Sequence, residues 1–186
     1  GGKTLALAAL MENTGQVYAW DYDGRRLKAI WPRLQRAGAR NVQVRDGKEA
    51  ETLGDLEGSV DCVFIDAPCT GSGTWRRRPD AKWKLKSEAL KRRMAEQDEV
   101  LSKAQAYVKP GGRLVYVTCS VLPEENEERI TGFLAGRDDF TPVPASQAIA
   151  SSGRLADGAK DRLSKLEGRH GAIQLTPRRT GTDGFY

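Results

Sequence analysis

The sequence is poor in the residues that build metal centres and disulfide-bonded scaffolds. Its 186 residues include one histidine, two methionines and three cysteines, and no cluster of cysteine and histidine has metal-ligand spacing. An odd number of cysteines, in a chain without a visible signal peptide, favours free thiols in a reducing cytoplasm. No window holds the roughly 18 consecutive apolar residues that a membrane span requires. We therefore expect a cytoplasmic protein without a metal site or a membrane segment.

The composition is that of one soluble globular domain with an excess of positive charge. Hydrophobic residues make up 39% and charged residues 30% of the chain, which is long enough to form a full core. The net charge of +5 favours an anionic partner such as a nucleic acid, although charge alone identifies none. There are no internal repeats, so we treat residues 1–186 as one domain and expect a monomer.

Strand-like and helix-like segments alternate along most of the chain. Apolar, β-branched runs predict strands over residues 16–21, 41–44, 60–66 and 113–119. Amphipathic or charged segments predict helices over residues 1–11, 24–37, 87–108 and 123–135, the last one capped by Ser120. This alternation is typical of an α/β fold with a mostly parallel sheet covered by helices on both faces.

Both ends of the chain depart from this pattern. Residues 141–172 show no period and predict an irregular insertion or loop with one short helix, and residues 173–186 predict two short strands around a turn, the last one cut short. A glycine-rich turn such as Gly1-Gly2 is normally fed by a strand, so we expect the chain to be a fragment whose first strand lies upstream.

Two cysteines directly follow predicted strands. Cys69 lies just after the strand over residues 60–66, and Cys119 lies at the end of the strand over residues 113–119. Because ligands of parallel sheets bind at the carboxyl edge, we expect the two thiols side by side at a binding site. Taken singly, each cysteine is more often a buried structural residue. As a pair they suggest one covalent step and one release step. Cys62, inside its strand, is expected to pack in the core.

Several motifs occur in a fixed order along the chain. They are Gly1-Gly2-Lys3-Thr4, Asp21 with Arg26, Asp46, Asp66-Ala67-Pro68-Cys69-Thr70-Gly71-Ser72-Gly73, Arg77-Arg78-Pro79-Asp80-Ala81-Lys82-Trp83, Thr118-Cys119-Ser120-Val121-Leu122-Pro123-Glu124-Glu125-Asn126, and Asp183-Gly184-Phe185. With them the chain resembles the Sun-type family of RNA cytosine-5 methyltransferases, most closely its bacterial small-subunit ribosomal RNA branch. It departs from the family after Pro142 and at Tyr186, where the family usually has phenylalanine.

The resemblance implies a Rossmann-like, S-adenosylmethionine-dependent methyltransferase domain that makes 5-methylcytidine in RNA, with 16S ribosomal RNA as the substrate. Carbon 5 of cytosine is a poor nucleophile, so a thiolate must first add to carbon 6. By resemblance, Cys119 makes this attack and Cys69 assists release. Asp66 holds the amino group and ring nitrogen of the base. Lys3 contacts the cytosine and is a source of the positive charge that favours the Cys119 thiolate.

The resemblance also implies a cofactor pocket. Its members are Gly1, Gly2, Lys3, Asp21, Arg26, Asp46, Asp66 and Pro68. The two glycines allow the backbone to approach the methionine end of the cofactor closely. Asp21 is placed to accept hydrogen bonds from ribose hydroxyls, with Arg26 bracing it, and Asp46 to reach the adenine amino group. Each of these charged residues, considered alone, is more often a solvated surface residue.

A cationic segment follows the Cys69 motif. It contains Arg76, Arg77, Arg78 and Lys82, with Trp75 and Trp83 interleaved. This combination suits RNA phosphates and stacking on unpaired bases. The target cytosine must leave its stack to reach two thiols at strand ends.

Two other functions remain open at this point. Gly2-Lys3-Thr4 also fits the tail of a phosphate-binding loop of an NTPase, with residues 63–66 as the magnesium-binding strand, but this leaves both cysteine motifs unexplained. The chain is also compatible with an RNA-binding remnant that has no activity. An amino-group methyltransferase is disfavoured, because Asp66-Ala67-Pro68-Cys69 lacks the aromatic residue after proline on which the base would stack.

Overall fold

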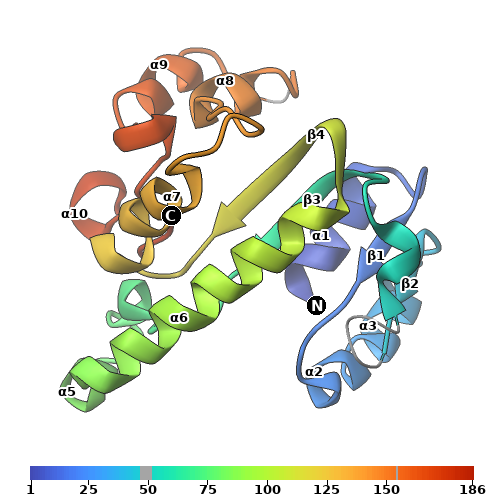
Figure 1. The fold of residues 1–186 in the computed structure, drawn as a ribbon, viewed down its shortest axis with the longest axis horizontal. Coiled ribbons are helices and arrows are strands. Elements are labelled where there is room, and N and C mark those ends of the chain that lie inside the picture. The colour runs from blue at the N-terminus through green and yellow to red at the C-terminus, as the bar shows by residue number, and fades with distance from the viewer. Residues whose placement is uncertain (47–51, 154) are drawn as a thin grey trace. The chain divides into compact units, whose positions relative to one another are not determined.

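Two pairs of parallel strands organise the chain. A computed structural model describes residues 1–46, 52–153 and 155–186 (Figure 1), and they divide into an N-terminal unit, Gly1–Glu57, and a C-terminal unit, Gly58–Tyr186. Within the described residues the strands form two two-stranded sheets, one in each unit. Parallel pairing and the alternation of strands with helices agree with the predicted α/β class. None of the described helices is long and apolar enough to cross a membrane.

In the N-terminal unit, two short parallel strands are flanked by helices. The elements are α1 (Gly2–Leu10), β1 (Val17–Ala19), α2 (Gly24–Lys28), α3 (Trp31–Ala37), β2 (Val42–Val44) and the 3₁₀ turn η1 (Gly54–Leu56). The β1 and β2 strands pair in register from Val17 opposite Val42 to Ala19 opposite Val44. Ala19 packs with Ile30 and Leu34 of the helical segment, which fixes the two strands against α3.

The helix predicted over residues 24–37 is broken in two. Its first part, α2, ends at Lys28, and α3 begins at Trp31 with Pro32 in its first turn. Proline has no backbone N–H and is tolerated only in the first turn of a helix, so a continuous helix through Pro32 is unfavourable. The predicted stop at Gly38 is confirmed, because this residue adopts the left-handed conformation with φ of 61°.

The C-terminal unit carries the longer sheet and most of the helices. Its strands are β3 (Val60–Asp66) and β4 (Val108–Val117), and its α-helices are α5 (Ala81–Lys84), α6 (Ser87–Ala104), α7 (Glu127–Leu134), α8 (Ala145–Ala150), α9 (Ala159–Ser164) and α10 (Pro177–Thr180). Four 3₁₀ turns complete it: η2 (Ser72–Thr74), η3 (Gln105–Tyr107), η4 (Pro123–Glu125) and η5 (Arg169–Gly171). The β4 strand begins five residues earlier than predicted, at Val108 instead of Arg113, since Pro110-Gly111-Gly112 lies within it and not before it.

One face of the β3–β4 pair packs against α6, which runs along the strands in Figure 1. Ile65 and Ala67 form a buried cluster with Leu101 and Ala104 of α6. Side chains alternate along a strand, so Cys62 lies on the other face, where it is exposed. The prediction that Cys62 packs in the core is therefore wrong, because its side chain lies on the face of β3 opposite the one that packs against α6.

The tail contains more structure than predicted. Residues 141–172 contain two short helices, α8 and α9, where one was expected. In place of two strands, residues 173–186 form isolated antiparallel bridges: Ile173 pairs with Glu167, and Leu175 pairs with Phe185, with α10 between Leu175 and Phe185. Tyr186 then exchanges two backbone hydrogen bonds with Thr118, each 3.1 Å long. The end of the tail thus pairs with the chain directly beside Cys119.

Close backbone packing of Gly73 and Gly184 yields the first prediction. A Cβ atom on Gly73 would lie 2.2 Å from the Gly184 carbonyl oxygen, which is backbone and has no room to move aside. We expect Gly73→Ala to lower the free energy of unfolding by about 1–3 kcal/mol, measured by urea denaturation. Gly132→Ala in α7 is the control, because open space surrounds that glycine and the change should stabilise the helix. Equal stability of the two variants would contradict the close packing.

Candidate active site

The structure brings two cysteine thiols together at the carboxyl ends of β3 and β4. The Sγ atoms of Cys69 and Cys119 lie 3.4 Å apart, and both side chains are half-buried. Their strands are paired to the end, since the Ala67 N–H continues the ladder by donating to the Val117 carbonyl at 3.0 Å. The sequence predicted that the two thiols would meet at this edge of the sheet.

Contact with Cys119 makes the Cys69 thiol reluctant to lose its proton. The Cys119 sulfur, through a hydrogen bond, and then burial raise the pKa of Cys69 well above its usual range. Backbone N–H groups of Cys119 and Gly71 lower the pKa of Cys69, but by less. Cys69 therefore keeps its proton. Because the two sulfur atoms are in contact, the charge of one affects the pKa of the other.

The segment around Cys69 is held by two buried polar side chains. The Glu125 carboxylate accepts hydrogen bonds from the Thr70 backbone N–H at 2.8 Å and from the Thr70 hydroxyl at 2.5 Å. Gln97 of α6 donates from Nε2 to the Pro68 carbonyl at 2.8 Å and to Glu125 at 3.1 Å. Neither Glu125 nor Gln97 is accessible to solvent. The residues on either side of Cys69 are thus fixed from inside the protein.

The segment around Cys119 is held in a similar way by Asn126. Its Oδ1 accepts a 2.6 Å hydrogen bond from the Thr118 hydroxyl, and its Nδ2 donates to the Ser120 carbonyl at 3.0 Å. Asn126 also donates to Gln174 Oε1 at 2.7 Å, which ties this segment to the tail. Both neighbours of Cys119 are therefore bound by one amide side chain.

Ser120 does not cap the helix that follows it. The first residues of the predicted helix form the separate turn η4, and α7 begins only at Glu127. The Ser120 hydroxyl instead accepts a hydrogen bond from the Leu122 N–H at 3.0 Å and shares one of 2.9 Å with Ser72. Ser120 thus joins the two cysteine-bearing segments to each other, and the prediction of a helix cap is wrong.

Three residues of this network carried no predicted role. Glu125 and Asn126 belong to the motif that begins at Thr118, so their position in that motif was the available signal. Gln97 gave no such signal, because a polar residue in a charged helix is normally solvated. Asp66, which was predicted, is the last residue of β3 and is exposed, and Pro68, also predicted, directly precedes Cys69 and is half-buried.

In the N-terminal unit, two predicted carboxylates follow paired strands. Asp21 comes two residues after Ala19 and Asp46 two residues after Val44, and these strand residues pair with each other. Asp46 Oδ1 would lie 2.8 Å from a Cβ atom on Gly24, so the missing side chain of Gly24 makes room for that carboxylate. One Asp21 oxygen accepts the Asp23 N–H at 2.9 Å. The two acids therefore share one edge of this sheet.

The other predicted residues of the N-terminal unit are exposed. Gly1 caps α1, and Gly2 and Lys3 form its first turn. Arg26 does not pair with Asp21 as expected. Its guanidinium lies 4.0 Å from Asp23, the residue that caps α2, because a residue three positions back in the same helical turn is nearer.

The cationic segment after η2 divides into paired and unpaired side chains. Arg76 and Arg77 both contact Asp183 of the tail, at 3.3 Å and 2.5 Å, although more than half of each side chain is exposed. Arg78 and Lys82 are exposed, and the Lys82 ammonium lies 4.6 Å from the centre of the Trp83 ring. Trp83 itself is 82% exposed, whereas Trp75 is half-buried. Trp83 therefore presents an exposed aromatic surface with the Lys82 ammonium beside it.

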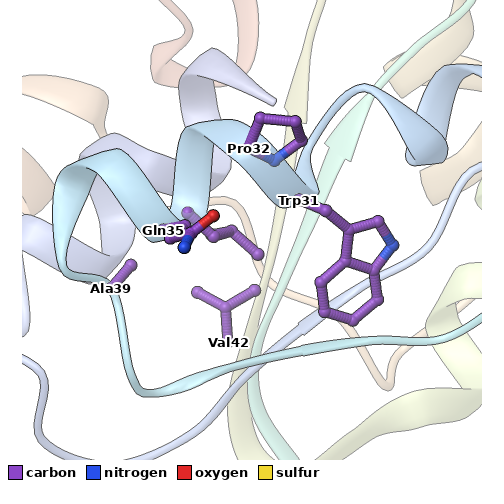
Figure 2. A pocket seen from close by; sticks show the side chains of 6 residues that line it. Trp31, Pro32, Gln35, Ala39 and Val42 are labelled. Atoms are coloured by element: carbon purple, nitrogen blue, oxygen red, sulfur yellow. The ribbon is translucent and has the colours of Figure 1, made fainter.

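A hollow of about 470 Å³ lies beside α3 in the N-terminal unit (Figure 2). It is lined by Trp31, Pro32, Leu34, Gln35, Ala39 and Val42. None of the residues predicted to bind the cofactor or RNA lines it, so it is not the predicted pocket.

The family described as 16S rRNA methyltransferase RsmB/F matches this chain over residues 1–186. The chain belongs to this family. Ribosomal RNA small subunit methyltransferase B of Klebsiella pneumoniae (strain 342) is 38% identical over 151 residues, which are 78% of this chain and 35% of that protein. The chain spans about a third of the length of the curated relatives it matches.

Solved structures agree with this assignment. The crystal structure of PH0851 has a TM-score of 0.83 and 35% identity, and it covers 100% of this chain and 39% of that one. The structure of NSun6 from Pyrococcus horikoshii with SFG has a TM-score of 0.72 at 24% identity and covers 100% of this chain and 43% of that one. These matches confirm the Rossmann-like α/β methyltransferase fold, and membership in the RsmB/F family favours a methyltransferase over an NTPase.

The thiol pair yields the second prediction. Replacing Cys119 with alanine removes the largest cause of the raised pKa of Cys69, while burial remains. We expect the pKa of Cys69 to fall in Cys119→Ala, so that its thiolate forms at a lower pH than in the parent protein. Ultraviolet absorbance of the thiolate, followed during a pH titration, measures this. Cys62→Ala present in both proteins removes the background thiol, and an unchanged Cys69 titration would refute the coupling.

Proposed function

We propose that this chain is the catalytic part of an S-adenosylmethionine-dependent enzyme that methylates carbon 5 of a cytidine in RNA, with 16S ribosomal RNA as substrate. The observation that carries the proposal is the 3.4 Å contact of Cys69 with Cys119, in which the proton stays on Cys69. Membership in the RsmB/F family supports the RNA substrate. We further propose that the protein acts as a monomer in the cytoplasm.

In the first step, Cys119 supplies the nucleophile. Its thiolate adds to carbon 6 of cytosine, forming a C–S bond and moving electron density to carbon 5. The hydrogen bond from Cys69 stabilises this thiolate before the attack. Asp66 binds the amino group and ring nitrogen of the base, which stabilises the adduct while ring electrons move. S-adenosylmethionine, when bound, supplies the methyl group that carbon 5 takes up.

In the second step, Cys69 supplies the base. Once Cys119 is bonded to carbon 6, its sulfur no longer carries a negative charge. The main cause of the raised pKa of Cys69 is then gone, and this thiol releases its proton to water more readily. The Cys69 thiolate removes the proton from carbon 5, the C–S bond breaks, and Cys119 leaves as a thiolate. Cys69 thus becomes basic at the stage at which a base is needed.

Most of the residues that we propose for the cofactor belong to the N-terminal unit, and Asp66 and Pro68 belong to the C-terminal unit. Asp21 and Asp46, at the ends of paired strands, suit the ribose hydroxyls and the adenine amino group, and Gly1 and Gly2 leave the start of α1 open. Lys3, Asp66 and Pro68 complete the proposed set, and Lys3 also contacts the cytosine. Arg26 contributes positive charge from α2. The related NSun6 structure with SFG, an analogue of S-adenosylmethionine, supports this choice of cofactor.

The cationic segment is the proposed RNA surface. Arg78 and Lys82 offer exposed charges to phosphates, and Trp83 offers an aromatic surface for stacking of an unpaired base. Arg76 and Arg77 share Asp183, which offsets part of their charge and fixes their place. We assign them a smaller share of phosphate binding than Arg78 and Lys82.

An RNA-binding role without catalysis is the second candidate, because the exposed Arg78, Lys82 and Trp83 could bind RNA without any reaction at the thiols. Binding of S-adenosylmethionine, measured by calorimetry, separates the two. A protein that binds RNA but neither the cofactor nor cytosine covalently would be the remnant, and one that hydrolyses a nucleotide would be the NTPase.

The third prediction tests the covalent step. In the full-length protein, Cys69→Ala blocks release, so incubation with S-adenosylmethionine and unmodified small-subunit ribosomal RNA should leave a protein–RNA adduct that migrates slowly on a denaturing gel. Adding Cys119→Ala should abolish the adduct, because the attacking sulfur is gone. Cys62→Ala is the control and should retain normal turnover. An adduct that survives Cys119→Ala would disprove the assignment of the nucleophile.

The fourth prediction tests the RNA surface. Replacing Arg78 and Lys82 together with alanine should weaken RNA binding and make the salt dependence shallower, by roughly 1 to 2 in the slope of log K against log salt. Cofactor affinity should not change. The matched control replaces Lys160 and Arg162, two exposed cations of α9, and should leave both RNA affinity and slope as they were. The same loss in both double variants would show that only net charge matters.

A further inference from the structure

We propose that Glu125 and Asn126 are positioning residues that together set the distance between the two catalytic thiols. They are consecutive in sequence, yet each binds a different cysteine-bearing segment. Glu125 binds the residue after Cys69, and Asn126 binds both neighbours of Cys119. This inference rests on the proposed function, because it assigns the two residues to the release and attack steps of that reaction.

The Cys69 segment is held by the Glu125 carboxylate, which is surrounded by hydrogen-bond donors. Two donors of Thr70 and one of Gln97 converge on the two oxygens of Glu125 at distances of 2.5 to 3.1 Å. Glu125 is fully buried, so water cannot replace any of these donors. Gln97 uses its second N–H on the Pro68 carbonyl, so the chain is held on both sides of Cys69.

The contact with the Cys119 segment is an amide that uses both of its ends. Asn126 accepts from the Thr118 hydroxyl and donates to the Ser120 carbonyl, and it is 1% exposed. Thr118 is in turn fixed by its backbone pairing with Tyr186. A shift of Asn126 would therefore move the backbone on both sides of the attacking sulfur.

The turn that carries both residues is itself anchored to β4. Tyr116 donates from its hydroxyl to the Glu125 carbonyl at 2.8 Å. Burial, and then the Glu125 charge, raise the pKa of Tyr116, so it remains a donor throughout the ordinary pH range. The β4 strand, the turn and the two cysteine-bearing segments thus form one connected unit, which holds Cys69 and Cys119 at their observed distance.

Replacing Glu125 by glutamine tests this arrangement without changing the shape of the side chain. A glutamine brings one N–H₂ group. Facing the Thr70 hydroxyl, this group turns that hydroxyl from a donor into an acceptor, and facing the Thr70 and Gln97 N–H groups it meets two donors, so in either orientation the charge-assisted hydrogen bonds of the carboxylate are lost. We expect the Cys69 segment to shift while the Cys119 segment, held by Asn126, stays in place. A displacement of about 1 Å can cost about a hundredfold in rate, so the release step should slow by this order.

The decisive experiment compares Glu125→Gln with Glu128→Gln in the full-length protein with Cys69 intact. Glu128→Gln makes the same chemical change in α7, at a side chain that is exposed. Incubated with S-adenosylmethionine and unmodified small-subunit ribosomal RNA, Glu125→Gln should accumulate the protein–RNA adduct and turn over about a hundredfold more slowly. Glu128→Gln should do neither. The proposal would be overturned if Glu125→Gln turned over as fast as Glu128→Gln. It would also be overturned if Glu125→Gln slowed adduct formation as much as it slowed release.

A pair of Thr70 variants covers the case in which Glu125→Gln fails to fold. Thr70→Val removes only the hydroxyl that donates to Glu125 and keeps the backbone N–H, whereas Thr70→Ser retains the hydroxyl. We expect the adduct to accumulate in Thr70→Val and turnover to return in Thr70→Ser. The same behaviour of both variants would show that the hydroxyl has no positioning role.

A measurement without RNA separates this inference from the proposed function. Phenylarsine oxide binds two adjacent thiols through two As–S bonds and releases one water, so its affinity reports the distance between Cys69 and Cys119. We expect weaker binding by Glu125→Gln than by Glu128→Gln, and equal binding would overturn the positioning role. If Cys69→Ala forms no adduct with RNA, the proposed function fails, whereas the arsenical comparison still decides whether Glu125 sets the distance.

Discussion

A carboxylate that is cut off from water must find its hydrogen-bond donors inside the protein, and Glu125 finds them next to Cys69. This requirement fixes the chain after β3 against the turn that follows β4, two segments that are far apart in sequence. The serine pair Ser72–Ser120 and the amide of Asn126 complete the same network. Because every member depends on its partners, the geometry at the thiols is a property of the network and not of either strand alone.

In the proposed reaction, the two thiols differ because only one of them is charged at a time. They lie at equivalent strand ends and are both half-buried, so burial alone does not distinguish them. The short sulfur–sulfur contact allows only one of them to be charged, since two thiolates at this distance would repel each other. A change of charge at Cys119 in the proposed reaction then alters the pKa of Cys69 without movement of the backbone.

Much of the secondary structure was predictable from sequence, whereas the side-chain contacts between distant segments were not. The apolar run of residues 60–66 predicted β3 with both of its ends, and two parallel strands were enough to bring Cys69 and Cys119 to one edge. Arg76 and Arg77 were predicted to bind RNA, and their ion pairs with Asp183 were not predicted, because Asp183 lies more than 100 positions away in sequence. Gln97 was missed because a polar residue in a charged helix is normally solvated. Pro32 was a local signal for the break between α2 and α3, but the amphipathic pattern of residues 24–37 favoured one continuous helix.

The pairing of Tyr186 with Thr118 has a consequence for how the protein is made. Chains fold from the N-terminus as they leave the ribosome, so β3, α6 and β4 are available for packing well before the tail is synthesised. Thr118 pairs through its backbone with Tyr186, and Gly73 with Gly184, residues that are synthesised well after the strands. The cysteine site is therefore completed only after this segment has been made, and a nascent chain that stops before Asp183 has its thiols but lacks the backbone that holds them.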